Sequence, residues 1–364
     1  MATVKLGTLI KPAKLQKCGE NDYPVLSMTM HDGLVFQSDK FKKSVASQDK
    51  STYKIVYRNQ LVIGFPIDEG VLATQRITDA GIVSPAYGIW DVVQTKIIPE
   101  FLEYALRSER AIDYYKAKLR SSTARRRSLP TPTLLELDIP LPDIEQQKIA
   151  LTIIRNVKNA MDNRRKQLSK LDELVKAHFI EMFGDPVRNP MNWKRVRFDS
   201  ICENLDSRRV PITESDRKKG VYPYYGASGI VDWVDDYIFD ENVLLVSEDG
   251  ANLLMRSTPI AFSISGKTWV NNHAHVVRFQ DFATQKFIET YFSMIDVSEY
   301  ITGTAQPKLN QAKLNAMEFC LPPLSLQNQF AAFVEEVDKQ KQTVQQSLDK
   351  LELLKKALMQ EYFG

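Results

Sequence analysis

A short segment in the second half of the chain concentrates side chains that can read a nucleic-acid base. Residues 271–275 are Asn-Asn-His-Ala-His. Amides and imidazoles donate and accept hydrogen bonds in the patterns that base edges present. His273 and His275 would lie on one face of a strand, where they could also bind a metal ion. The sequence offers no third ligand, so we expect no metal site.

Two basic, polar loops occupy corresponding places in the two halves of the chain. Residues 118–127 end in three arginines, and residues 302–308 read Thr-Gly-Thr-Ala-Gln-Pro-Lys. Each loop lies between a predicted helix and a short predicted exit strand. Arg and Lys beside Ser and Thr suit phosphate contacts, although most basic clusters, such as Arg208 with Arg209, are solvated surface. The shared position favours DNA contact by both loops.

Two further segments of the second half are rich in small residues. Residues 224–229 read Tyr-Tyr-Gly-Ala-Ser-Gly, and residues 247–252 read Ser-Glu-Asp-Gly-Ala-Asn. Small residues in loops let the backbone approach a ligand closely. Ordinary turns use the same residue types, so both interpretations stay open.

No set of residues predicts catalysis. Residues 265–268 read Ser-Gly-Lys-Thr and resemble the end of a phosphate-binding loop, but Ala261 stands where the first glycine is required. The chain has no dinucleotide-binding fingerprint, no amino-methyltransferase motif, and no evident Ser/His/Asp or Cys/His set. We therefore expect a partner to supply any catalytic residues.

The elements that must position these motifs are repeated. Residues 139–184 and 320–364 both begin with a proline-ended stretch, continue as a long predicted helix containing Leu-x-Lys-Leu, and end at Phe-Gly. The offset between the copies is 181 residues at the start and 180 at the end. Asp143 is the expected N-cap of the first helix, and the second helix should begin near Ser325. A repeat of this length indicates two copies of one design.

Hydrophobic residues recur every seven positions along both predicted helices. The series are Ile154, Met161, Leu168, Val175 and Met182, then Phe330, Val337, Val344, Leu351 and Leu358. Such heptads predict a coiled coil, and helices separated by a whole block can pair antiparallel. Arg164, His178, Lys341 and Lys355 interrupt the stripes, where they could fix the register or lie at its edge. The alternative is two unrelated amphipathic helices, each packed on its own block.

The blocks that precede the helices are both predicted to be α+β. The strands expected in the second block, before a helix at 284–294, are 237–239, 243–246, 260–264 and 275–279. Those expected in the first block, before one helix at 100–117, are 53–57, 60–63 and 88–93. The blocks agree in layout and differ in sequence, whereas the helices agree in sequence. This pattern is expected if each block recognises something different while the helices do one constant job.

Composition sets broad limits on the class of protein. The chain has 364 residues, of which 43% are hydrophobic and 26% charged, as in ordinary globular proteins. It lacks the run of about 18 apolar residues that would span a bilayer and an apolar signal core. We therefore expect a cytoplasmic protein with no membrane partner. The three cysteines share no metal-type spacing and suit a reducing compartment. The net charge of +3 permits an acidic partner without requiring one.

Motifs spread over essentially the whole chain occur in a specific combination. They are Asn192-Trp193-x-x-Val196, the segment 224–229, Gly250-Ala251, and the segments 272–275 and 303–309. To these are added the openings and the Phe-Gly endings of the two helices. In this combination the chain resembles the specificity (S) subunits of type I restriction–modification systems. The first block departs from the family pattern, because it lacks a Trp-containing opening and its basic loop is Arg-rich.

The resemblance implies an α+β fold with two target-recognition domains of mixed strands and helices, each followed by a long helix. The two helices would pair as an antiparallel coiled coil with pseudo-twofold symmetry. The division would be 1–141 for the first recognition domain, 142–184 for the central helix, 185–322 for the second recognition domain and 323–364 for the C-terminal helix.

The resemblance also implies a function without catalysis in this chain. Each domain would read one half of a bipartite site in double-stranded DNA, while the helices space the half-sites and dock two methyltransferase (M) subunits. The complex would methylate adenine N6 and, with restriction (R) subunits, cleave DNA. The cofactors S-adenosylmethionine, ATP and Mg are expected in the partner subunits and none in this chain.

The residues expected to contact DNA come from both blocks. In the first block they are Ser27, Arg58, Gln75, Arg125, Arg126 and Arg127. In the second block they are Tyr225, Ser228, Asn252, Asn271, Asn272, His273, Gln306 and Lys308.

Three other interpretations remain compatible with the sequence. A scaffold of two ligand-binding modules on a coiled coil would show no DNA sequence preference. An enzyme that acts on nucleic acid through a carboxylate site would cleave DNA by itself with a metal ion. An inactive or exchangeable allele of a specificity subunit would keep the fold without an active system.

Overall fold

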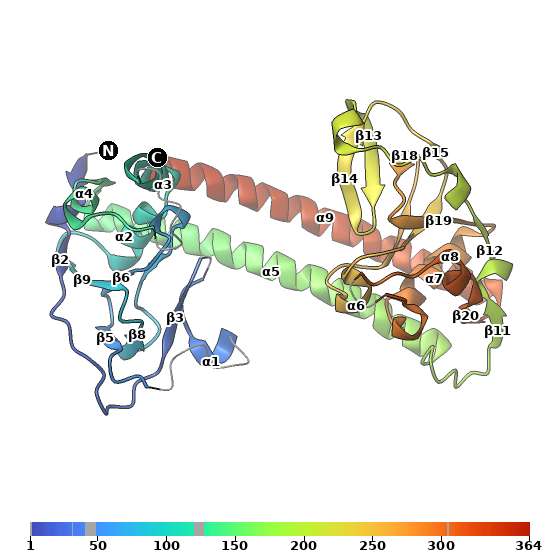
Figure 1. The fold of residues 1–364 in the computed structure, drawn as a ribbon, viewed down its shortest axis with the longest axis horizontal. Helices are drawn as coiled ribbons and strands as arrows, with labels where there is room; N and C mark the ends of the chain where they lie inside the picture. Colours follow the sequence, from blue (N-terminus) through green and yellow to red (C-terminus); the bar gives the residue numbers. More distant parts are fainter. Residues whose placement is uncertain (1, 31, 41–48, 120–126, 304–305) are drawn as a thin grey trace. The chain divides into compact units, whose positions relative to one another are not determined.

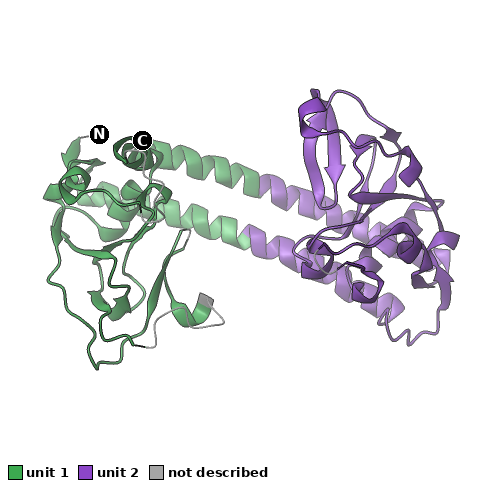
Figure 2. Cartoon of the chain, viewed as in Figure 1, with its two compact units in different colours: residues 1–163, 348–364 green, residues 164–347 purple. Residues whose placement is uncertain are grey.

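A computed structural model describes this chain. The described residues are 2–30, 32–40, 49–119, 127–303 and 306–364. The chain forms two compact units, of which the first combines Met1–Asn163 with Leu348–Gly364 and the second is Arg164–Ser347 (Figure 2). The first unit therefore contains both ends of the chain, and the second is one continuous segment.

The first unit is built on a four-stranded antiparallel sheet in the order β2-β9-β6-β7. These strands are β2 (Ile10–Pro12), β6 (Leu61–Ile63), β7 (Leu72–Thr74) and β9 (Gly88–Val92). The other paired strands are β1 (Thr3–Lys5) with β10 (Asp138–Pro140), β3 (Leu26–Thr29) with β4 (Gly33–Phe36), and β5 (Lys54–Tyr57) with β8 (Ala80–Val83). The short helices are α1 (Gln37–Lys40), α2 (Pro99–Leu106), α3 (Glu109–Lys118) and α4 (Thr131–Leu135).

The second unit contains two four-stranded sheets and a two-stranded pair. The first sheet has the order β12-β19-β16-β17, the second has the order β14-β13-β18-β15, and β11 pairs with β20. The strands are β11 (Lys194–Arg197), β12 (Cys202–Asn204), β13 (Lys219–Gly226), β14 (Gly229–Val234), β15 (Phe239–Asp240), β16 (Val243–Ser247), β17 (Ala261–Ile264), β18 (Lys267–Val270), β19 (Ala274–Phe279) and β20 (Glu318–Leu321). The short helices are α6 (Asn252–Met255), α7 (Phe282–Phe292) and α8 (Gln311–Ala316).

Strand β16 shows why the first of these sheets forms. It reads Val-Leu-Leu-Val-Ser and is buried along its whole length. Successive side chains of a strand point to opposite faces. Leu244 and Val246 accordingly join the core that contains Phe287 of α7, whereas Val243 and Leu245 join a separate core on the other face. Both faces of the central strands are therefore covered, which explains the continuous apolar run.

The two units repeat one arrangement (Figure 1). The sheet β2-β9-β6-β7 of the first unit corresponds to β12-β19-β16-β17 of the second, with the same strand order and the same antiparallel pairing. In each unit a helix, α2 or α7, follows the sheet, and a short helix, α4 or α8, precedes the exit strand. The blocks thus share a fold although their sequences diverge.

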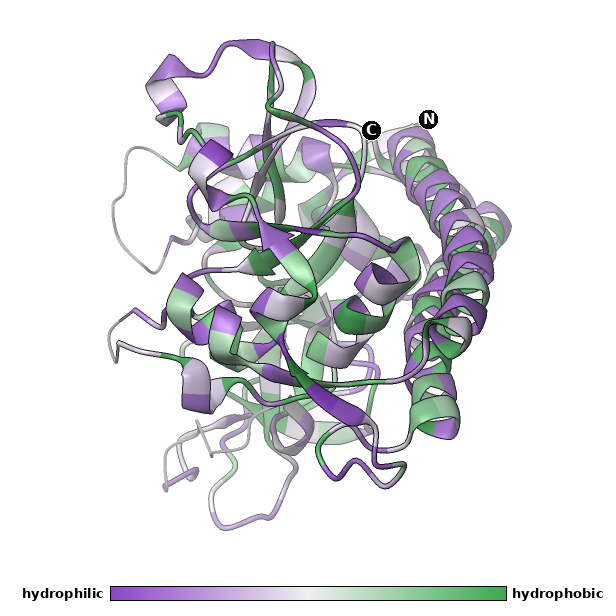
Figure 3. Cartoon of the chain, turned by 90° about the vertical axis from the view of Figure 1, so that its right-hand side faces the viewer, coloured by the Kyte–Doolittle hydropathy of each residue, from purple (hydrophilic) through white to green (hydrophobic). Residues whose placement is uncertain are grey.

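Two long helices run through both units. They are α5 (Ile144–Phe183) and α9 (Leu324–Phe363), each of 40 residues. The Asp143 carboxylate accepts the backbone N–H of Gln146 at 2.8 Å, as expected of an N-cap. Gly184 follows α5 with a φ of 77°, which favours glycine at a helix end. Hydrophobic and hydrophilic residues alternate along both helices (Figure 3).

The helices pair antiparallel within the second unit. In the second unit Arg164 donates to Ser347 at 3.2 Å, Lys341 lies 2.5 Å from Asp172, and the ring of His178 lies 4.2 Å from that of Phe333. The partner's residue number falls as that of α5 rises, so the chain directions are opposite. Arg164, His178 and Lys341, which interrupt the heptads, therefore make cross-helix contacts.

Both helices also contribute to the unit cores. Phe179 of α5 and Phe330 of α9 belong to the core of the second unit, and Ile154 and Phe363 belong to the core of the first. Phe363 of the second helix thus packs on the first block. The alternative of two helices that each pack only on their own block is therefore wrong.

Two sequence predictions about local structure are corrected. The helix expected at 100–117 is two helices, α2 and α3, because the Ser108 hydroxyl accepts the N–H of Ala111 and caps a new helix. Tyr224 and Tyr225 belong to strand β13 rather than to a loop, and Tyr224 is a core residue. Among the described residues no helix is both long and apolar enough to cross a membrane.

Candidate nucleic-acid interface

Four segments that the sequence singled out meet beside the first sheet of the second unit. They are 224–229, 247–252, 271–275 and the described part of 302–309, and we call them the loop cluster. Hydrogen bonds join them in sequence-distant pairs, and four are between backbone groups. The donor and acceptor pairs are Asn271 N–H to Tyr225 C=O at 3.0 Å, Glu248 N–H to His273 C=O at 2.9 Å, Gly250 N–H to Pro307 C=O at 3.0 Å, Leu309 N–H to Glu248 C=O at 2.8 Å, and Ser247 Oγ–H to Ala227 C=O at 2.5 Å.

The glycines of the loop cluster serve the protein's own packing and turns. A side chain at Gly226 would meet the amide of Asn271 at 3.3 Å. Gly250 has a φ of 104°, a conformation that L side chains rarely adopt. Ordinary turn and packing requirements therefore account for both glycines.

Five of the predicted residues present exposed side chains on the loop cluster. They are Ser228, Asn272, His273, Gln306 and Lys308. Amide, imidazole, hydroxyl and ammonium groups among them can form hydrogen bonds with base edges or phosphate oxygens. These side chains are the ones available to a ligand.

Three other predicted residues of the second unit shape the loop cluster instead. Asn271 is buried, and its side-chain oxygen accepts the N–H of His273 at 2.8 Å. The Asn252 amide accepts the N–H of Thr258 and donates to the same residue's carbonyl, both at 3.0 Å. Tyr225 is half-buried, and burial raises the pKa of its hydroxyl. The side-chain amides of Asn271 and Asn252 are thus directed at the chain itself.

The exposed cation and imidazole of the loop cluster have acidic neighbours. The Lys308 ammonium lies 3.0 Å from Glu248, and the His273 imidazole lies 2.9 Å from Asp249. Burial alone would raise the pKa of Glu248, but hydrogen bonds from Arg209 and Lys308 hold it below its usual value. Glu248 is thus ionised, and part of the Lys308 charge is already neutralised.

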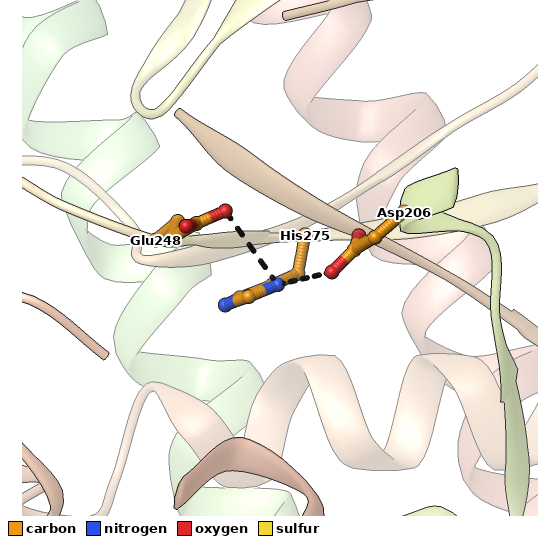
Figure 4. Close-up of side chains that lie close together, drawn as sticks. All are labelled: Asp206, Glu248 and His275. Atoms are coloured by element: carbon orange, nitrogen blue, oxygen red, sulfur yellow. Dashed lines mark hydrogen bonds and ion pairs between the residues drawn. The ribbon is translucent and has the colours of Figure 1, made fainter. Parts of the chain in front are cut away.

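A buried polar network lies beneath the exposed side chains of the loop cluster (Figure 4). His275 contacts Asp206 at 2.6 Å and lies 3.8 Å from Glu248, while Arg209 contacts Glu248 at 2.7 Å. Burial would raise the pKa of Asp206, but the His275 hydrogen bond and charge, with Arg209, hold it low. Arg209 is mostly buried, which corrects its interpretation as solvated surface. Sequence inspection missed this network, and the only local signal was the Asp206–Arg209 spacing of three residues.

Three side chains of the same network are of the types that bind metal ions. Asp206, Glu248 and His275 offer ligand atoms within 4.8 Å of one another. The His275 nitrogens are already bonded to Asp206 and to the Leu309 carbonyl, and Arg209 neutralises the carboxylates. The Arg209 guanidinium is therefore already paired with the two carboxylates of this group.

The first unit repeats the loop contact. Ile67 N–H donates to the Arg127 carbonyl at 3.1 Å, just as Gly250 N–H donates to Pro307. The Arg127 guanidinium pairs with Asp68 at 2.9 Å and Glu69 at 2.5 Å. In both units a basic residue of the loop before the last short helix thus pairs with an acidic residue between corresponding strands. These strands are β6 and β7 in the first unit and β16 and β17 in the second.

The other residues predicted for the first unit lie on several of its elements. Ser27 lies on β3, and Arg58 pairs with Asp79 at 2.9 Å on the surface. Gln75 is fully buried, and its amide donates to the Thr78 carbonyl at 2.6 Å, so it orders a turn. Arg125 and Arg126 lie outside the described residues. The structure brings Arg58 and Gln75 together, because the Arg58 guanidinium donates to the Arg76 carbonyl at 2.7 Å and the Asn59 N–H donates to the Gln75 carbonyl at 2.8 Å.

Comparison with known proteins finds a family match for the part of the chain that contains the loop cluster. Residues 190–353 match the family described as the type I restriction modification DNA specificity domain. The resemblance to type I specificity subunits is confirmed. The chain is 31% identical over 145 residues to a putative type I restriction enzyme specificity subunit of Haemophilus influenzae, which covers 40% of this chain and 37% of that protein. It is 21% identical over 274 residues to the type I restriction enzyme MjaIX specificity subunit of Methanocaldococcus jannaschii, covering 66% and 62%. The chain thus spans less than two thirds of the length of both relatives.

Solved structures extend the similarity of fold to the whole chain. The crystal structure of a type I restriction-modification system S subunit from M. genitalium matches with a TM-score of 0.58 at 12% identity, covering 100% of this chain and 96% of that one. A chain from a study of complex assembly and conformational transition of the type I R-M system matches with a TM-score of 0.57 at 14% identity, covering 100% and 97%. The predicted fold class is confirmed.

Proposed function

We propose that this chain is the non-catalytic DNA-recognition subunit of a type I restriction–modification complex. The observation that carries the proposal is the convergence of four sequence-distant polar segments on one loop cluster, within a unit that matches a DNA specificity family. The repeated fold of the first unit supports a bipartite target, because two similar modules with different loops can read two different half-sites. We assign the modules to 1–141 and 185–322 and the helices to 142–184 and 323–364.

The exposed groups of the loop cluster divide by chemistry. Lys308, and Arg127 in the first unit, would contact phosphates and supply affinity that depends on salt. Asn272, His273 and Gln306 would contact base edges and supply sequence preference. Asn271, Asn252 and Gln75 would act through the shape of their loops.

The two long helices would set the spacing of the half-sites. Forty residues of α-helix are roughly 60 Å long at about 1.5 Å per residue. Paired recognition modules on one face of DNA read half-sites about one helical turn apart, roughly 34–36 Å. The proposal therefore expects a split target with a fixed gap.

The helices also carry a pair of exposed leucines suited to docking two like partners. Leu174 of α5 and Leu354 of α9 stand 180 residues apart, at the same position of the repeat, and both are 47% exposed. Equivalent apolar side chains on the two helices would bind two copies of one methyltransferase subunit. Restriction subunits would join that complex, and S-adenosylmethionine, ATP and Mg would be used by the partners.

The docking assignment is tested by Leu174→Glu and Leu354→Glu. Each should reduce the stoichiometry of bound methyltransferase from two toward one, measured by the mass of the complex. Val187→Glu is the control, because Val187 is exposed outside the helices. Two bound subunits in both leucine variants would refute this docking surface.

The function is tested by co-expression with a type I methyltransferase subunit from the same organism in a host without DNA methylation. N6-methyladenine mapped over the genome should define one split motif with two short half-sites and a fixed gap. Replacement of residues 185–319 by the same block of another specificity subunit should change one half and leave the other. Methylation without a sequence motif would contradict the proposal. A folded complex that binds DNA without preference would favour the scaffold interpretation.

A further inference from the structure

His275 is a buried imidazole whose two nitrogens both face hydrogen-bond acceptors. Only 1% of the residue is exposed. Nδ1 lies 2.6 Å from a carboxylate oxygen of Asp206, and Nε2 lies 2.8 Å from the backbone carbonyl oxygen of Leu309 (Figure 4 shows the first contact). A carbonyl and a carboxylate both accept, so the hydrogen-bond network is satisfied when both ring nitrogens donate.

The Nε2 contact reaches the loop that carries two of the exposed candidate residues. Leu309 directly follows Lys308, and Gln306 lies two residues before Lys308. Thr302 and Lys308 exchange two backbone hydrogen bonds of 2.8 Å, which close the loop on itself. The Leu309 N–H donates to the Glu248 carbonyl at 2.8 Å. The closed loop is therefore attached on both sides of Leu309, through its N–H to Glu248 and through its carbonyl to His275.

The Nδ1 contact reaches the opposite side of the ring. Asp206 accepts the N–H of Val276 at 2.8 Å and the Asn204 amide at 3.1 Å, so it is fixed on the sheet independently of the loop. Arg209 lies 3.3 Å from Asp206 and 2.7 Å from Glu248. The charged groups around the ring are thus Asp206, Glu248, Arg209 and, through Glu248, Lys308.

We propose that His275 is a positioning residue that sets where Gln306 and Lys308 stand relative to DNA. It acts through the hydrogen bond from Nε2 to the Leu309 carbonyl and does not itself touch DNA. The proposal rests on the proposed function, since it assumes that the loop cluster reads DNA. It goes further because it assigns the position of Gln306 and Lys308 to the hydrogen bond from Nε2 to Leu309, and not to the hydrogen bond from Nδ1 to Asp206.

Two amide substitutions separate the two hydrogen bonds. In His275→Gln the amide nitrogen takes the place of Nε2 and can still donate to Leu309. In His275→Asn the amide nitrogen takes the place of Nδ1 and can donate to Asp206, but it cannot reach Leu309. If His275 served stability alone, the two variants would discriminate between bases equally well. A positioning role predicts that only His275→Gln preserves base discrimination.

The experiment uses the complete complex with methyltransferase subunits and the target found by methylation mapping. Affinity is measured for the target and for DNA with each single base-pair change in the half-site read by residues 185–319. One mismatch costs about 1–3 kcal/mol, or about 5–150-fold. His275→Gln should keep this discrimination within about twofold at every position. His275→Asn should lose about tenfold discrimination at the positions read by residues 306–308 and keep it elsewhere. In His275→Asn the slope of log affinity against log salt concentration should also fall, by at most about 0.9, because Lys308 shifts together with Gln306, whereas His275→Gln should keep the slope.

Asp206→Asn tests the same assignment if the His275 variants fail to fold. It leaves Nε2 free to donate to Leu309 and keeps an acceptor for Nδ1, so discrimination should be retained. Loss of discrimination in Asp206→Asn, or equal discrimination in both His275 variants, would overturn the positioning role. A wild-type complex that binds all sequences alike would instead overturn the proposed function itself.

Discussion

The aromatic ring of Phe363 lies 4.8 Å from that of Phe101, measured between ring centroids. Phe363 is the last residue of α9 and is fully buried in the core of the first unit. Ile154 of α5 belongs to the same core. The last turn of the chain thus completes the module formed by its first residues.

Replacement of this ring should destabilise the first unit. Loss of a buried phenylalanine side chain costs about 3–5 kcal/mol, because both apolar burial and packing are lost. We expect Phe363→Ala to lower the free energy of unfolding of the first unit by that amount. Amide hydrogen exchange in α2 would report the change.

Phe183 supplies the matched control for this prediction. It occupies the repeat position 180 residues earlier and is buried in the core of the second unit. Phe183→Ala should accelerate exchange in α7 rather than in α2. Equal effects of both variants on both helices would contradict the assignment of each phenylalanine to one core.

Removal of the Lys308 ammonium should weaken DNA binding for all sequences alike. A lysine that contacts one phosphate contributes about 0.9 to the slope of log affinity against log salt concentration. We expect Lys308→Ala to lower that slope by at most about 0.9, because Glu248 already neutralises part of the charge. The slope is measured with the complete complex between low and physiological salt.

Lys339→Ala is the control for the salt measurement. Lys339 is exposed on α9 and pairs with Glu336. Its removal should leave the slope unchanged. An unchanged slope in Lys308→Ala as well would remove Lys308 from the DNA interface.

Neighbouring asparagines should give opposite results. Asn272 is exposed, so Asn272→Ala should relax one base position by about 1–3 kcal/mol without loss of stability. Asn271 accepts a buried backbone N–H, so Asn271→Ala should lower the free energy of unfolding by about 1–3 kcal/mol. Methylation mapping and urea unfolding measure the two effects. An Asn272→Ala complex with an unchanged motif would show that this amide reads no base.

The sequence predicted the long helices well because their information is local and repeated. Asp143 was identified as the N-cap, and α5 begins at the next residue. The heptads identified Val175 and Val337 as core residues. They did not identify Phe179, which lies outside the series and is buried by α7 through Phe287 at 5.0 Å between ring centroids. That contact depends on tertiary packing and leaves no periodic pattern.

The candidate interface was predicted as a set of segments and not as an arrangement. The sequence singles out the segments 247–252, 271–275 and 302–308 one by one, and only the structure shows that the described parts of these segments meet. The sequence could not separate exposed Asn272 from buried Asn271, because that difference depends on a turn. It also could not pair Asp206 with His275, which are 69 residues apart.

The buried glutamate of α2 should make the first unit sensitive to acid. Burial alone would raise the pKa of Glu100, but hydrogen bonds and charges from Arg155 and Arg76 hold it below the usual glutamate value. The resulting stabilisation is complete above the unfolded-state pKa of about 4.3 and is lost as pH falls through the lower folded-state pKa. Glu100→Gln should remove this acid dependence and cost about 1–2 kcal/mol at neutral pH.

Urea unfolding between pH 7 and pH 3 checks the acid dependence. Glu145→Gln is the control, since Glu145 forms an exposed pair with Lys148 three residues later and such pairs contribute little. The control should unfold like the wild type at every pH. An acid dependence that persists unchanged in Glu100→Gln would assign the effect to other carboxylates.

The order in which the units can be finished during synthesis is the reverse of their order in the sequence. The second unit, Arg164–Ser347, is one continuous segment and is whole before the final turns of α9 are made. The first unit lacks Phe363 until residue 363 has been translated, about 200 residues after Asn163. At about 5–20 residues per second, this delay is roughly 10–40 s on the ribosome. A nascent chain would therefore carry an open apolar surface at its N-terminal end while its C-terminal module is already closed. A truncation just before Phe363 would therefore damage the module that was synthesised first.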